Sequence, residues 1–323
     1  MEARSLARRA IAAVPAAIGI VALAAAAVRI ALRDHVDILS VLFYAFPPAV
    51  LLVAFAAAGL GFLARRRFRT AALSLAAAVA CFFWWRATAF VSNSPDARPA
   101  DLRVLHWNVS YPEEHWPVVA AKIRTLSPDF ASIAELWKED PVPDAFWREQ
   151  LPGYSLQPTQ GRFTLATKWP VEKSVLEPLG GRNVAKRYLL DVRGRRLWII
   201  LVDFASDPLV SRRASFESLR GLLAPLDRDP VLLMGDFNTP ADSAFLDPFR
   251  ARYRNAFETA GRGCTATWPM PFPVLSIDQI WANRAFIARR CEHGASILSD
   301  HRWVFAEFSL PAAPERKDPP RAP

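Results

Sequence analysis

The sequence is poor in cysteine, which limits the metal and redox chemistry it can support. Only three cysteines occur among the 323 residues, and none of them forms a CxxC pair. A zinc site of that type is therefore unsupported. Cys264 and Cys291 could form a disulfide in an oxidising compartment, and two free, buried thiols are the equally good alternative. The sequence also lacks internal repeats and low-complexity segments.

Net charge is nearly absent from the larger, second part of the chain. Residues 1–100 carry 11 Lys and Arg against 4 Asp and Glu, or +7, whereas residues 101–323 carry 29 against 27, or +2. Tight binding of duplex nucleic acid usually relies on many Lys and Arg contacts to phosphates. Nucleic acid therefore stays open as a partner, but the charge does not indicate it.

Long apolar runs dominate the first part of the chain. They cover residues 11–28, 38–63 and 71–91. A helix of about 20 residues is long enough to cross the hydrocarbon core of a bilayer. The first run begins like a signal peptide, but two more runs follow it and no convincing cleavage site is present. We therefore predict that residues 1–91 form three transmembrane helices, which anchor a multi-pass protein in the lipid bilayer of the cell membrane.

Arginine-rich segments indicate the orientation of this anchor. Three arginines lie near the N-terminus, and the RRRFR segment at residues 65–69 follows the second run. Lys and Arg accumulate on the cytoplasmic side of membrane proteins. With three spans, residues beyond 92 are predicted to lie outside the cytoplasm. Residues 92–100 are expected to be a polar linker, and residues 311–323 a disordered tail.

The second part of the chain has the pattern of an α/β protein. Strand-like apolar runs occur at residues 102–110, 130–137, 163–170, 185–193, 197–204, 231–238, 276–283 and 302–310. Helical patterns at 116–128 and 211–226 separate some of the runs, whereas 185–204 has the pattern of a hairpin around Gly194. This mixture of helix-linked and hairpin-linked strands predicts a sandwich with mixed sheets.

Polar side chains gather at the ends of these runs. They are Asn108, Glu135, Asp236, Asn238, Asp278, Asp300 and His301. In VLLMGDFNTP, positions i and i+2 of an extended chain face the same side, so Asp236 and Asn238 would project together. A simple turn is the alternative for this one stretch. Polar groups at the ends of several strands are what a site on a rigid scaffold requires.

This set resembles the endonuclease/exonuclease/phosphatase superfamily, which has the deoxyribonuclease I-like fold. The resemblance rests on WN at 107–108, AELW at 134–137, GDFN at 235–238, IDQI at 277–280 and SDH at 299–301. It covers residues 101–310, which we take as the catalytic domain. It implies an α/β four-layer sandwich of two mixed β-sheets flanked by helices, here preceded by the transmembrane helices. It also implies cleavage of phosphoester bonds with a divalent metal ion, usually Mg²⁺, with Mn²⁺ as an alternative.

Phosphoester hydrolysis needs charge neutralisation on the phosphoryl group and an activated water. A hard cation with oxygen ligands supplies the first need. Glu135 is the first choice as metal ligand, with Asn108 beside it and Asp300 contributing. The resemblance implies that Asp236 orients or deprotonates the attacking water. It also implies that Asn238 donates a hydrogen bond to the phosphoryl group or fixes the geometry of attack.

The resemblance gives His301 a role, but this chain lacks another histidine that the family usually has. By resemblance, His301 donates to the developing negative charge, and Asp278 accepts a hydrogen bond from its other ring nitrogen. The family usually has a histidine on a central strand where this chain has Asp203. Asp203 could be a carboxylic acid with a raised pKa, an extra metal ligand or a structural replacement. His106 shares the strand face of Asn108 and is expected to be packed rather than to substitute for the missing histidine.

The predicted function is that of a membrane-anchored, Mg²⁺-dependent phosphoesterase. Its substrate would be a phosphodiester or phosphomonoester, in nucleic acid, a phospholipid or a small molecule, and no obligate protein partner is inferred. The alternative is a catalytically impaired, anchored module that binds phosphate or nucleotide without turnover. A soluble part with a purely structural role would leave the polar strand ends unexplained.

Overall fold

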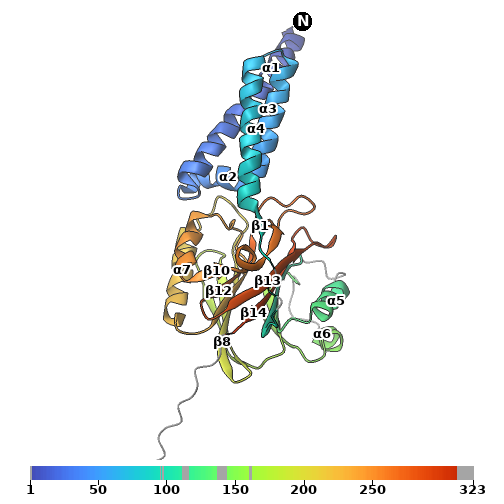
Figure 1. Ribbon diagram of the computed structural model, residues 1–323, viewed down its shortest axis with the longest axis vertical. Coiled ribbons are helices and arrows are strands. Elements are labelled where there is room, and N and C mark those ends of the chain that lie inside the picture. The colour runs from blue at the N-terminus through green and yellow to red at the C-terminus, as the bar shows by residue number, and fades with distance from the viewer. Residues whose placement is uncertain are drawn as a thin grey trace, which may run out of the picture.

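The computed structural model consists of a bundle of helices standing on a sandwich of two β-sheets (Figure 1). It describes residues 2–94, 96, 98–110, 116–136, 144–159 and 162–310. The predicted tail at 311–323 lies outside the described residues, as do residues 95 and 97 of the predicted linker. The described part of the linker is tied to the sandwich, because the carboxylate of Asp96 accepts a hydrogen bond from Arg289.

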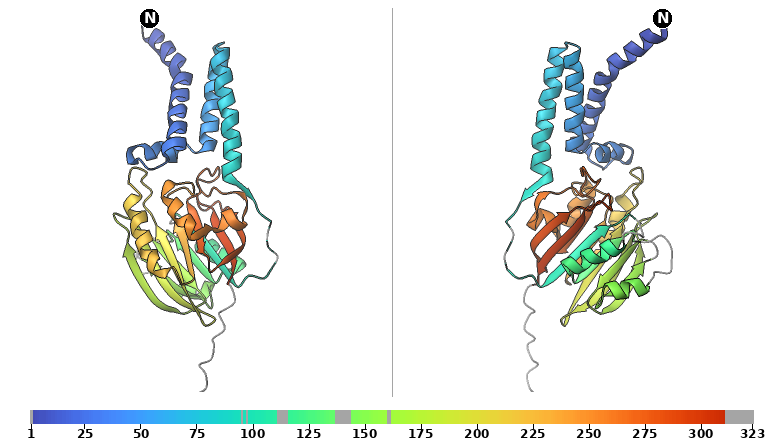
Figure 2. Two further views of the ribbon diagram at one scale, coloured as in Figure 1. Left: turned by 60° about the vertical axis from the view of Figure 1, so that its left-hand side comes forward. Right: turned by 90° about the vertical axis from the view of Figure 1, so that its right-hand side faces the viewer.

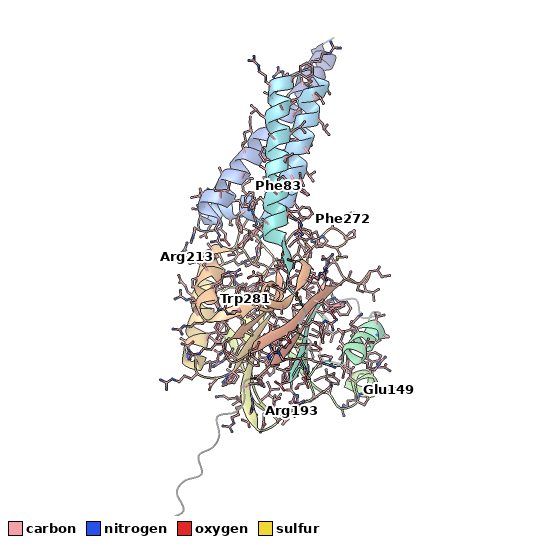
Figure 3. All side chains as sticks on the ribbon, in the orientation of Figure 1. Phe83, Glu149, Arg193, Arg213, Phe272 and Trp281 are labelled. Carbon is pink, nitrogen blue, oxygen red and sulfur yellow. The ribbon has the colours of Figure 1, made fainter. Side chains whose placement is uncertain are left out.

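Four helices make up the N-terminal region. They are α1 (Glu2–Ala27), which continues as a π-helical turn at Val28–Leu32, α2 (Asp37–Ala45), α3 (Pro48–Ala64) and α4 (Phe68–Ala89). Helices α1, α3 and α4 run side by side, and α2 crosses the end of the bundle that is nearest to the sandwich (Figure 2). Glycine permits the close packing, since a Cβ atom at Gly59 would lie 2.7 Å from Leu75. Large apolar side chains such as Phe83 point outward from the bundle, as expected for helices that face lipid (Figure 3).

Among the residues that the structure describes, two helical stretches are long and apolar enough to cross a membrane, which corrects the prediction of three. They are Ala12–Leu32 and Phe68–Ala89. The predicted second span, residues 38–63, is divided into α2 and α3, which are bent by 73° and give a third crossing only if the pair counts as one span. The division has a local cause. Pro47 and Pro48 lack the N–H groups that would continue α2, and Pro48 instead occupies the favourable first position of α3.

Two six-stranded sheets form the sandwich, and each is mixed. One has the order β13-β14-β2-β3-β5-β4, and the other has the order β10-β12-β9-β8-β7-β6. The strands of the first are β2 (Leu102–Asn108), β3 (Phe130–Ala134), β4 (Ser155–Thr159), β5 (Phe163–Thr167), β13 (Ile287–Gly294) and β14 (Trp303–Ser309). Those of the second are β6 (Val171–Pro178), β7 (Val184–Val192), β8 (Arg195–Asp203), β9 (Val231–Asp236), β10 (Tyr253–Asn255) and β12 (Asp278–Asn283). A small third sheet pairs β1 (Phe90–Ser92), which follows α4, with β11 (Arg262–Cys264).

Helices cover the outer face of each sheet, which gives four layers. Helices α5 (Trp116–Leu126) and α6 (Asp144–Gln150) pack on the first sheet, and α7 (Arg213–Leu223) and a 3₁₀ helix (Ala244–Ala251) pack on the second (Figure 1). The central residues of β8, from Leu197 to Val202, are apolar because both faces of the strand are covered. Ile199 and Leu201 face the core between the sheets, whereas Ile200 and Val202 face α7. A short helix, α8 (Ala256–Ala260), follows β10.

Each sheet contains one parallel pair of strands at its centre. Strand β2 pairs with β3 after the crossover helix α5, and β8 pairs with β9 after α7. The remaining neighbours in both sheets are antiparallel. The carboxyl ends of parallel strands lie at the same edge of a sheet, where ligand sites are commonly built. The carboxyl ends of β2 and β3, and those of β8 and β9, therefore lie at sheet edges where a ligand site is expected.

The loops that leave β8 and β9 contact the N-terminal helices. In the loop after β9, Asp242 forms an ion pair with the buried Arg29, and the backbone N–H of Ala244 donates to the buried carboxylate of Asp34. In the loop after β8, the hydroxyl of Ser211 donates to Asp37 at 2.8 Å. The β7–β8 hairpin, marked by Arg193, lies at the opposite end of the sandwich (Figure 3). The carboxyl ends of β8 and β9 therefore face the helices.

The three cysteines carry free thiols. Cys81 and Cys291 are buried, and Cys264 is partly exposed. Of the two alternatives for Cys264 and Cys291, the structure thus has the unpaired one.

Candidate active site

The GDFN stretch ends a buried strand with a tight turn. Residues Val231–Met234 are fully buried, and Gly235 (φ 152°) lies so close to the carbonyl oxygen of Val202 that a Cβ atom would not fit. Asp236 is the last residue of β9, and its Oδ1 accepts a hydrogen bond from the backbone N–H of Asn238 at 2.8 Å. The turn that ends β9 is therefore also the segment that positions Asp236 in the candidate site.

Asn238 differs from the prediction because the strand ends before it. Its φ of 42° is left-handed, so the alternation that would place it on the strand face of Asp236 no longer applies. Its side-chain N–H donates to the carbonyl oxygen of Phe204, just after β8, at 2.6 Å. Asn238 thus fixes the position of Asp236 through its backbone and ties the end of β9 to the end of β8.

Asn108 connects the two sheets at this edge. Its Nδ2 lies 3.1 Å from Oδ2 of Asp236 and 3.2 Å from Oε1 of Glu135. Its Oδ1 accepts a hydrogen bond from the backbone N–H of Ser110, which fixes the orientation of the amide. Asn108 was predicted to stand beside Glu135 as a metal ligand. In this orientation it is instead a donor to both carboxylates, because its oxygen is turned toward Ser110.

Glu135 follows β3 in a left-handed conformation, with a φ of 52°. Such a conformation is uncommon for residues other than glycine and concentrates at functional sites. The backbone N–H of Glu135 donates to the carbonyl oxygen of Arg162 at 2.8 Å. Burial raises the pKa of the Glu135 carboxyl, although the hydrogen bond from Asn108 opposes this effect.

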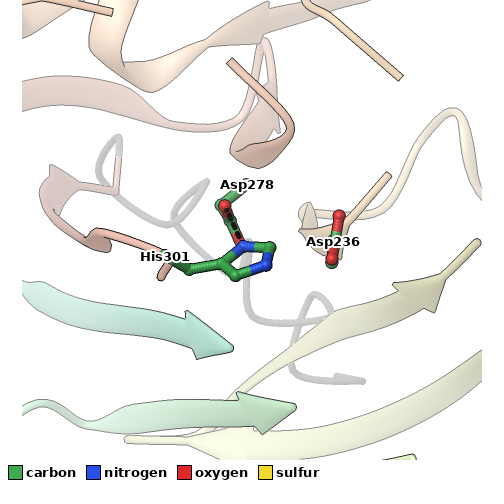
Figure 4. A group of neighbouring side chains, drawn as sticks. All are labelled: Asp236, Asp278 and His301. Atoms are coloured by element: carbon green, nitrogen blue, oxygen red, sulfur yellow. Dashed lines mark hydrogen bonds and ion pairs between the residues drawn. The ribbon is translucent and has the colours of Figure 1, made fainter. Parts of the chain in front are cut away.

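His301 and Asp278 form a buried pair next to Asp236 (Figure 4). Nδ1 of His301 lies 2.8 Å from Oδ2 of Asp278. Burial by itself would lower the pKa of His301, but the charge and hydrogen bond of Asp278 outweigh it and raise the pKa to about 10. His301, together with His106, whose Nε2 lies 3.3 Å from Oδ1 of Asp278, holds the pKa of Asp278 well below its usual value against the effect of burial. His301 is therefore a cation at neutral pH.

His106 is fully buried, with its other ring nitrogen 3.2 Å from the hydroxyl of Ser132. It has the packed position that we expected. It also supports Asp278 from the side opposite to His301, a contact that the sequence did not indicate.

Burial and the neighbouring charge of Asp278 raise the pKa of Asp236 to about 6. Asp236 is 2% exposed. A carboxylate with this pKa is ionised at neutral pH and is a better proton acceptor than an ordinary aspartate.

Asp300 lies at the rim, with half of its side chain exposed. Its Oδ1 accepts from the hydroxyl of Ser110 at 2.6 Å, and its Oδ2 accepts from Nε1 of Trp268 at 2.9 Å. These hydrogen bonds lower the pKa of Asp300 against the effect of burial. Nε2 of His301 is 3.8 Å from Oδ1 of Asp300. Asp300 thus lies beside His301 at the rim of the candidate site.

Asp203 pairs in register with Asp236 and carries an arginine partner that the sequence reasoning missed. Nη1 of Arg162 donates to Oδ2 of Asp203 at 2.7 Å, and a third of the Arg162 side chain is exposed. Burial raises the pKa of Asp203 to about 6 even with this partner. The contact joins residues of different sheets. No local pattern around Arg162 could have revealed it.

The donor set suits a hard divalent cation. Glu135, Asp236 and Asp300 offer carboxylate oxygens near one another, because Asn108 contacts both Glu135 and Asp236 and the charge of Asp300 acts on Glu135. Ligand atoms of Asp236, Asp278 and His301 also lie within 4.8 Å of one another. However, Asp278 and His301 are hydrogen-bonded to each other. Asp236 is therefore the member of that group best placed to meet a cation.

Comparison with known proteins agrees with this geometry. Residues 105–301 match the endonuclease/exonuclease/phosphatase family. No curated protein matches the sequence. Among solved structures, a humanized D. rerio TDP2 has 16% identity and a TM-score of 0.55, over 65% of this chain and 99% of its own. A mannosyl-6-phosphatase of Bacteroides thetaiotaomicron has 16% identity and a TM-score of 0.55, over 65% of this chain and 100% of its own.

A family protein from Beutenbergia cavernae shares 22% identity with a TM-score of 0.52, over 67% of this chain and 73% of its own. At such identities these structures establish the fold alone. The family match itself spans well over half of the chain and includes Asn108, Glu135, Asp236 and His301. This chain belongs to the endonuclease/exonuclease/phosphatase family, whose enzymes hydrolyse phosphoester bonds.

Proposed function

We propose that this chain is a membrane-anchored phosphoesterase that uses a divalent metal ion and water to cleave a phosphodiester or phosphomonoester. The observation that carries the proposal is the position of Asn108, which contacts Glu135 from one sheet and Asp236 from the other. The His301–Asp278 pair borders the same point. Acidic, amide and imidazole groups thus converge where a phosphoryl group could bind.

We assign the cation to Glu135, with Asp300 contributing from the rim. Bound Mg²⁺, or Mn²⁺ as the alternative, would neutralise charge on the phosphoryl oxygens. Asn108 holds the carboxylates of Glu135 and Asp236 together across the sandwich. The left-handed backbone of Glu135 is of the kind that concentrates at functional sites.

Asp236 is the proposed base, with Asn238 holding it in place. The oxygen of water forms a bond to phosphorus, and the bond from phosphorus to the leaving oxygen breaks. Asp236 takes one proton of the water, and the leaving oxygen gains a proton from bulk solvent. The pKa of about 6 suits this part because Asp236 is ionised at neutral pH yet remains basic.

Two cations of the chain are proposed to bind the phosphoryl group. His301 stays protonated because of Asp278, and its Nε2–H, which lies 3.8 Å from Oδ1 of Asp300, would donate to the charge that develops on the phosphoryl oxygens. Arg162 is held by Asp203 at the end of β8, with part of its side chain exposed. We propose that this pair takes over the phosphate contact of the histidine that family members usually carry at position 203.

A substrate panel tests the function. It comprises bis-p-nitrophenyl phosphate, p-nitrophenyl phosphate, nicked DNA and phospholipid, each with Mg²⁺, with Mn²⁺ and with chelator. We expect turnover that needs the metal. The alternative, an impaired binding module, predicts phosphate binding without turnover. Turnover that survives both Asp236→Ala and His301→Ala would overturn the proposed site.

We also propose that the domain at residues 101–310 lies outside the cytoplasm. The N-terminus and the α3–α4 turn, both rich in arginine, lie at the end of the bundle far from the sandwich (Figure 1). On the near side, Arg29 and Arg33 are in ion pairs with Asp242 and Asp247 of the domain, so they act as docking groups. A reporter fused after residue 92 should be active outside the cytoplasm, and activity inside would reverse the orientation.

A further inference from the structure

The loops beside the candidate active site contact the N-terminal helices. The loops that follow β8 and β9, whose ends carry Asp203 and Asp236, contact α1 and α2 through Arg29, Asp34 and Asp37. A substrate that reaches this edge from the side therefore approaches close to the level at which the helices enter the bilayer. The position of the edge constrains where a substrate comes from, but it does not by itself give the substrate's chemistry.

One loop, residues 268–276, connects the rim of the site to the helices. At one end, Nε1 of Trp268 donates to the carboxylate of Asp300, and the backbone N–H of Met270 donates to the Asp300 carbonyl oxygen at 2.7 Å. At the other end, Leu275 lines a cavity of about 280 Å³ together with Trp85 of α4. The loop thus spans the distance between a proposed metal ligand and the end of a membrane helix.

This loop exposes apolar surface. Phe272 is 82% exposed, and Figure 3 shows it near the end of α4 that adjoins the sandwich. Ile297, on the neighbouring loop, is fully exposed. Burial of large apolar side chains is favourable, so two exposed ones beside each other form a surface suited to an apolar partner.

Between these loops lies a cavity of about 550 Å³. Its apolar lining consists of Met270, Pro271, Ala295, Ile297 and Leu298, and its polar lining consists of Ser110, Ser296, Ser299 and Asp300, the last of which belongs to the candidate active site. Its volume is in the range of ligand pockets. None of the described residues that line it is basic, which is unlike a nucleic-acid groove.

We propose that this cavity binds the apolar part of a phospholipid from the bilayer that holds the anchor, so that the lipid's phosphoester lies at the candidate active site. The substrate class is then a long-chain phosphoester that stays in the membrane, with Phe272 and Ile297 in its head-group layer. This inference rests on the proposed function for its chemistry, and it rests on the cavity and the loop for its specificity.

The test compares substrates that share one phosphodiester and differ only in their chains. Full-length protein in phosphatidylcholine vesicles with Mg²⁺ is given dioleoyl phosphatidylglycerol or its deacylated counterpart, glycerophosphoglycerol. We expect kcat/KM to be at least tenfold higher for the long-chain substrate. In Phe272→Ser combined with Ile297→Ser, this ratio should fall at least fivefold. Leu176→Ser, which removes a half-exposed leucine from β6, is the matched control and should leave the ratio unchanged.

Equal kcat/KM for the two substrates, or an unchanged ratio in the double variant, would overturn the lipid assignment while turnover of bis-p-nitrophenyl phosphate still supported the hydrolase. If no phosphoester is turned over, the proposed function fails and a binding measurement decides the lipid assignment. A photo-crosslinking residue at position 272 should then label an alkyne-bearing phosphatidylglycerol, and one at position 176 should not. Equal labelling from both positions, or no labelling from 272, would contradict a lipid site.

Discussion

The two parallel strand pairs at the candidate active site are built alike but end in different side chains. Strands β2 and β3 are joined by α5 and end at Asn108 and Glu135, an amide beside a carboxylate. Strands β8 and β9 are joined by α7 and end at Asp203 and Asp236, two carboxylates in direct register. The first pair is satisfied by a hydrogen bond between its own members. The second pair needs positive charge from elsewhere.

This difference indicates that the two strand pairs have different roles in the proposed reaction. Burial raises the pKa of both carboxyls of the second pair to about 6. Arg162 is hydrogen-bonded to Asp203, whereas Asp236 feels the charge of His301, which is itself paired with Asp278. Groups with such pKa values handle protons and anionic substrate. The oxygen of Glu135, in the first pair, suits a metal ion. The predictions below separate these parts.

The largest effect is expected at Asp236, the proposed base in the second strand pair. Asp236→Asn should lower kcat/KM by about 10³-fold, because the amide cannot take a proton from water. Asp203→Asn, its neighbour in register, should cost only about tenfold. Steady-state kinetics with bis-p-nitrophenyl phosphate measures both variants, and circular dichroism checks that they fold. Equal losses in the two variants would show that the carboxylates act as one unit.

His301→Gln should lower kcat by about 10²-fold and change the pH profile. Asp236 must be ionised to act as a base, so activity should rise as pH increases through about 6. His301 must be protonated to donate, so activity should fall as pH increases through about 10. The variant should keep the acid limb and lose the basic limb. A basic limb that persists in His301→Gln would assign it to another group.

Glu135→Gln tests the first pair. Its apparent affinity for Mg²⁺ should fall on the order of 10–100-fold, since a neutral amide oxygen replaces a charged ligand. Titration of activity with Mg²⁺ measures this change, and saturating Mg²⁺ should recover much of the rate. In His301→Gln, the midpoint of the same titration should stay near its original value. A larger shift in His301→Gln than in Glu135→Gln would show that the metal ion is not bound chiefly by the first strand pair.

Arg162→Ala should raise KM about tenfold with a smaller change in kcat, because the lost guanidinium binds the phosphoryl group in ground and transition states alike. Arg162→Lys should recover part of the loss, since it keeps the charge. If Asp203 acts only by holding Arg162, then Asp203→Asn combined with Arg162→Ala should be no worse than Arg162→Ala alone. Fully additive losses would give Asp203 a part of its own.

Most of the polar residues of the candidate site could be placed from the sequence because they lie next to the apolar runs that form strands. Apolar runs reveal strands, and the fold then decides that their ends meet. Asn108, Glu135, Asp236 and His301 were each visible in this way. The order of strands in the sheets and the register of Asp203 with Asp236 required the structure.

Three features could not be predicted, each for a physical reason. Arg162 meets Asp203 across the sandwich, and no local pattern records such a contact. Asn238 leaves the strand face because its left-handed backbone follows from the turn at Asp236 rather than from strand periodicity. The second apolar run satisfies the length of a membrane span, but Pro47 and Pro48 divide it into two helices.

The smallest predicted effect concerns how the anchor supports the second pair. Asp34 is fully buried, and its carboxylate accepts from Ser243, from the N–H of Ala244 and from the hydroxyl of Tyr44. Asp34→Ala leaves these donors without their partner, at a cost of about 1–3 kcal/mol. It loosens the loop that follows β9, so kcat should fall on the order of threefold and thermal inactivation should begin at lower temperature.

Asp37→Ala is the matched control for Asp34→Ala, because Asp37 lies on the same segment but makes an exposed side-chain contact, with Ser211. Its kcat and inactivation temperature should stay close to those of the unchanged protein, since exposed contacts contribute little. The Mg²⁺ titration should be unaltered in both variants, because Glu135 belongs to the other strand pair. If Asp34→Ala changes kcat no more than Asp37→Ala does, the anchor holds the enzyme at the membrane without supporting its base.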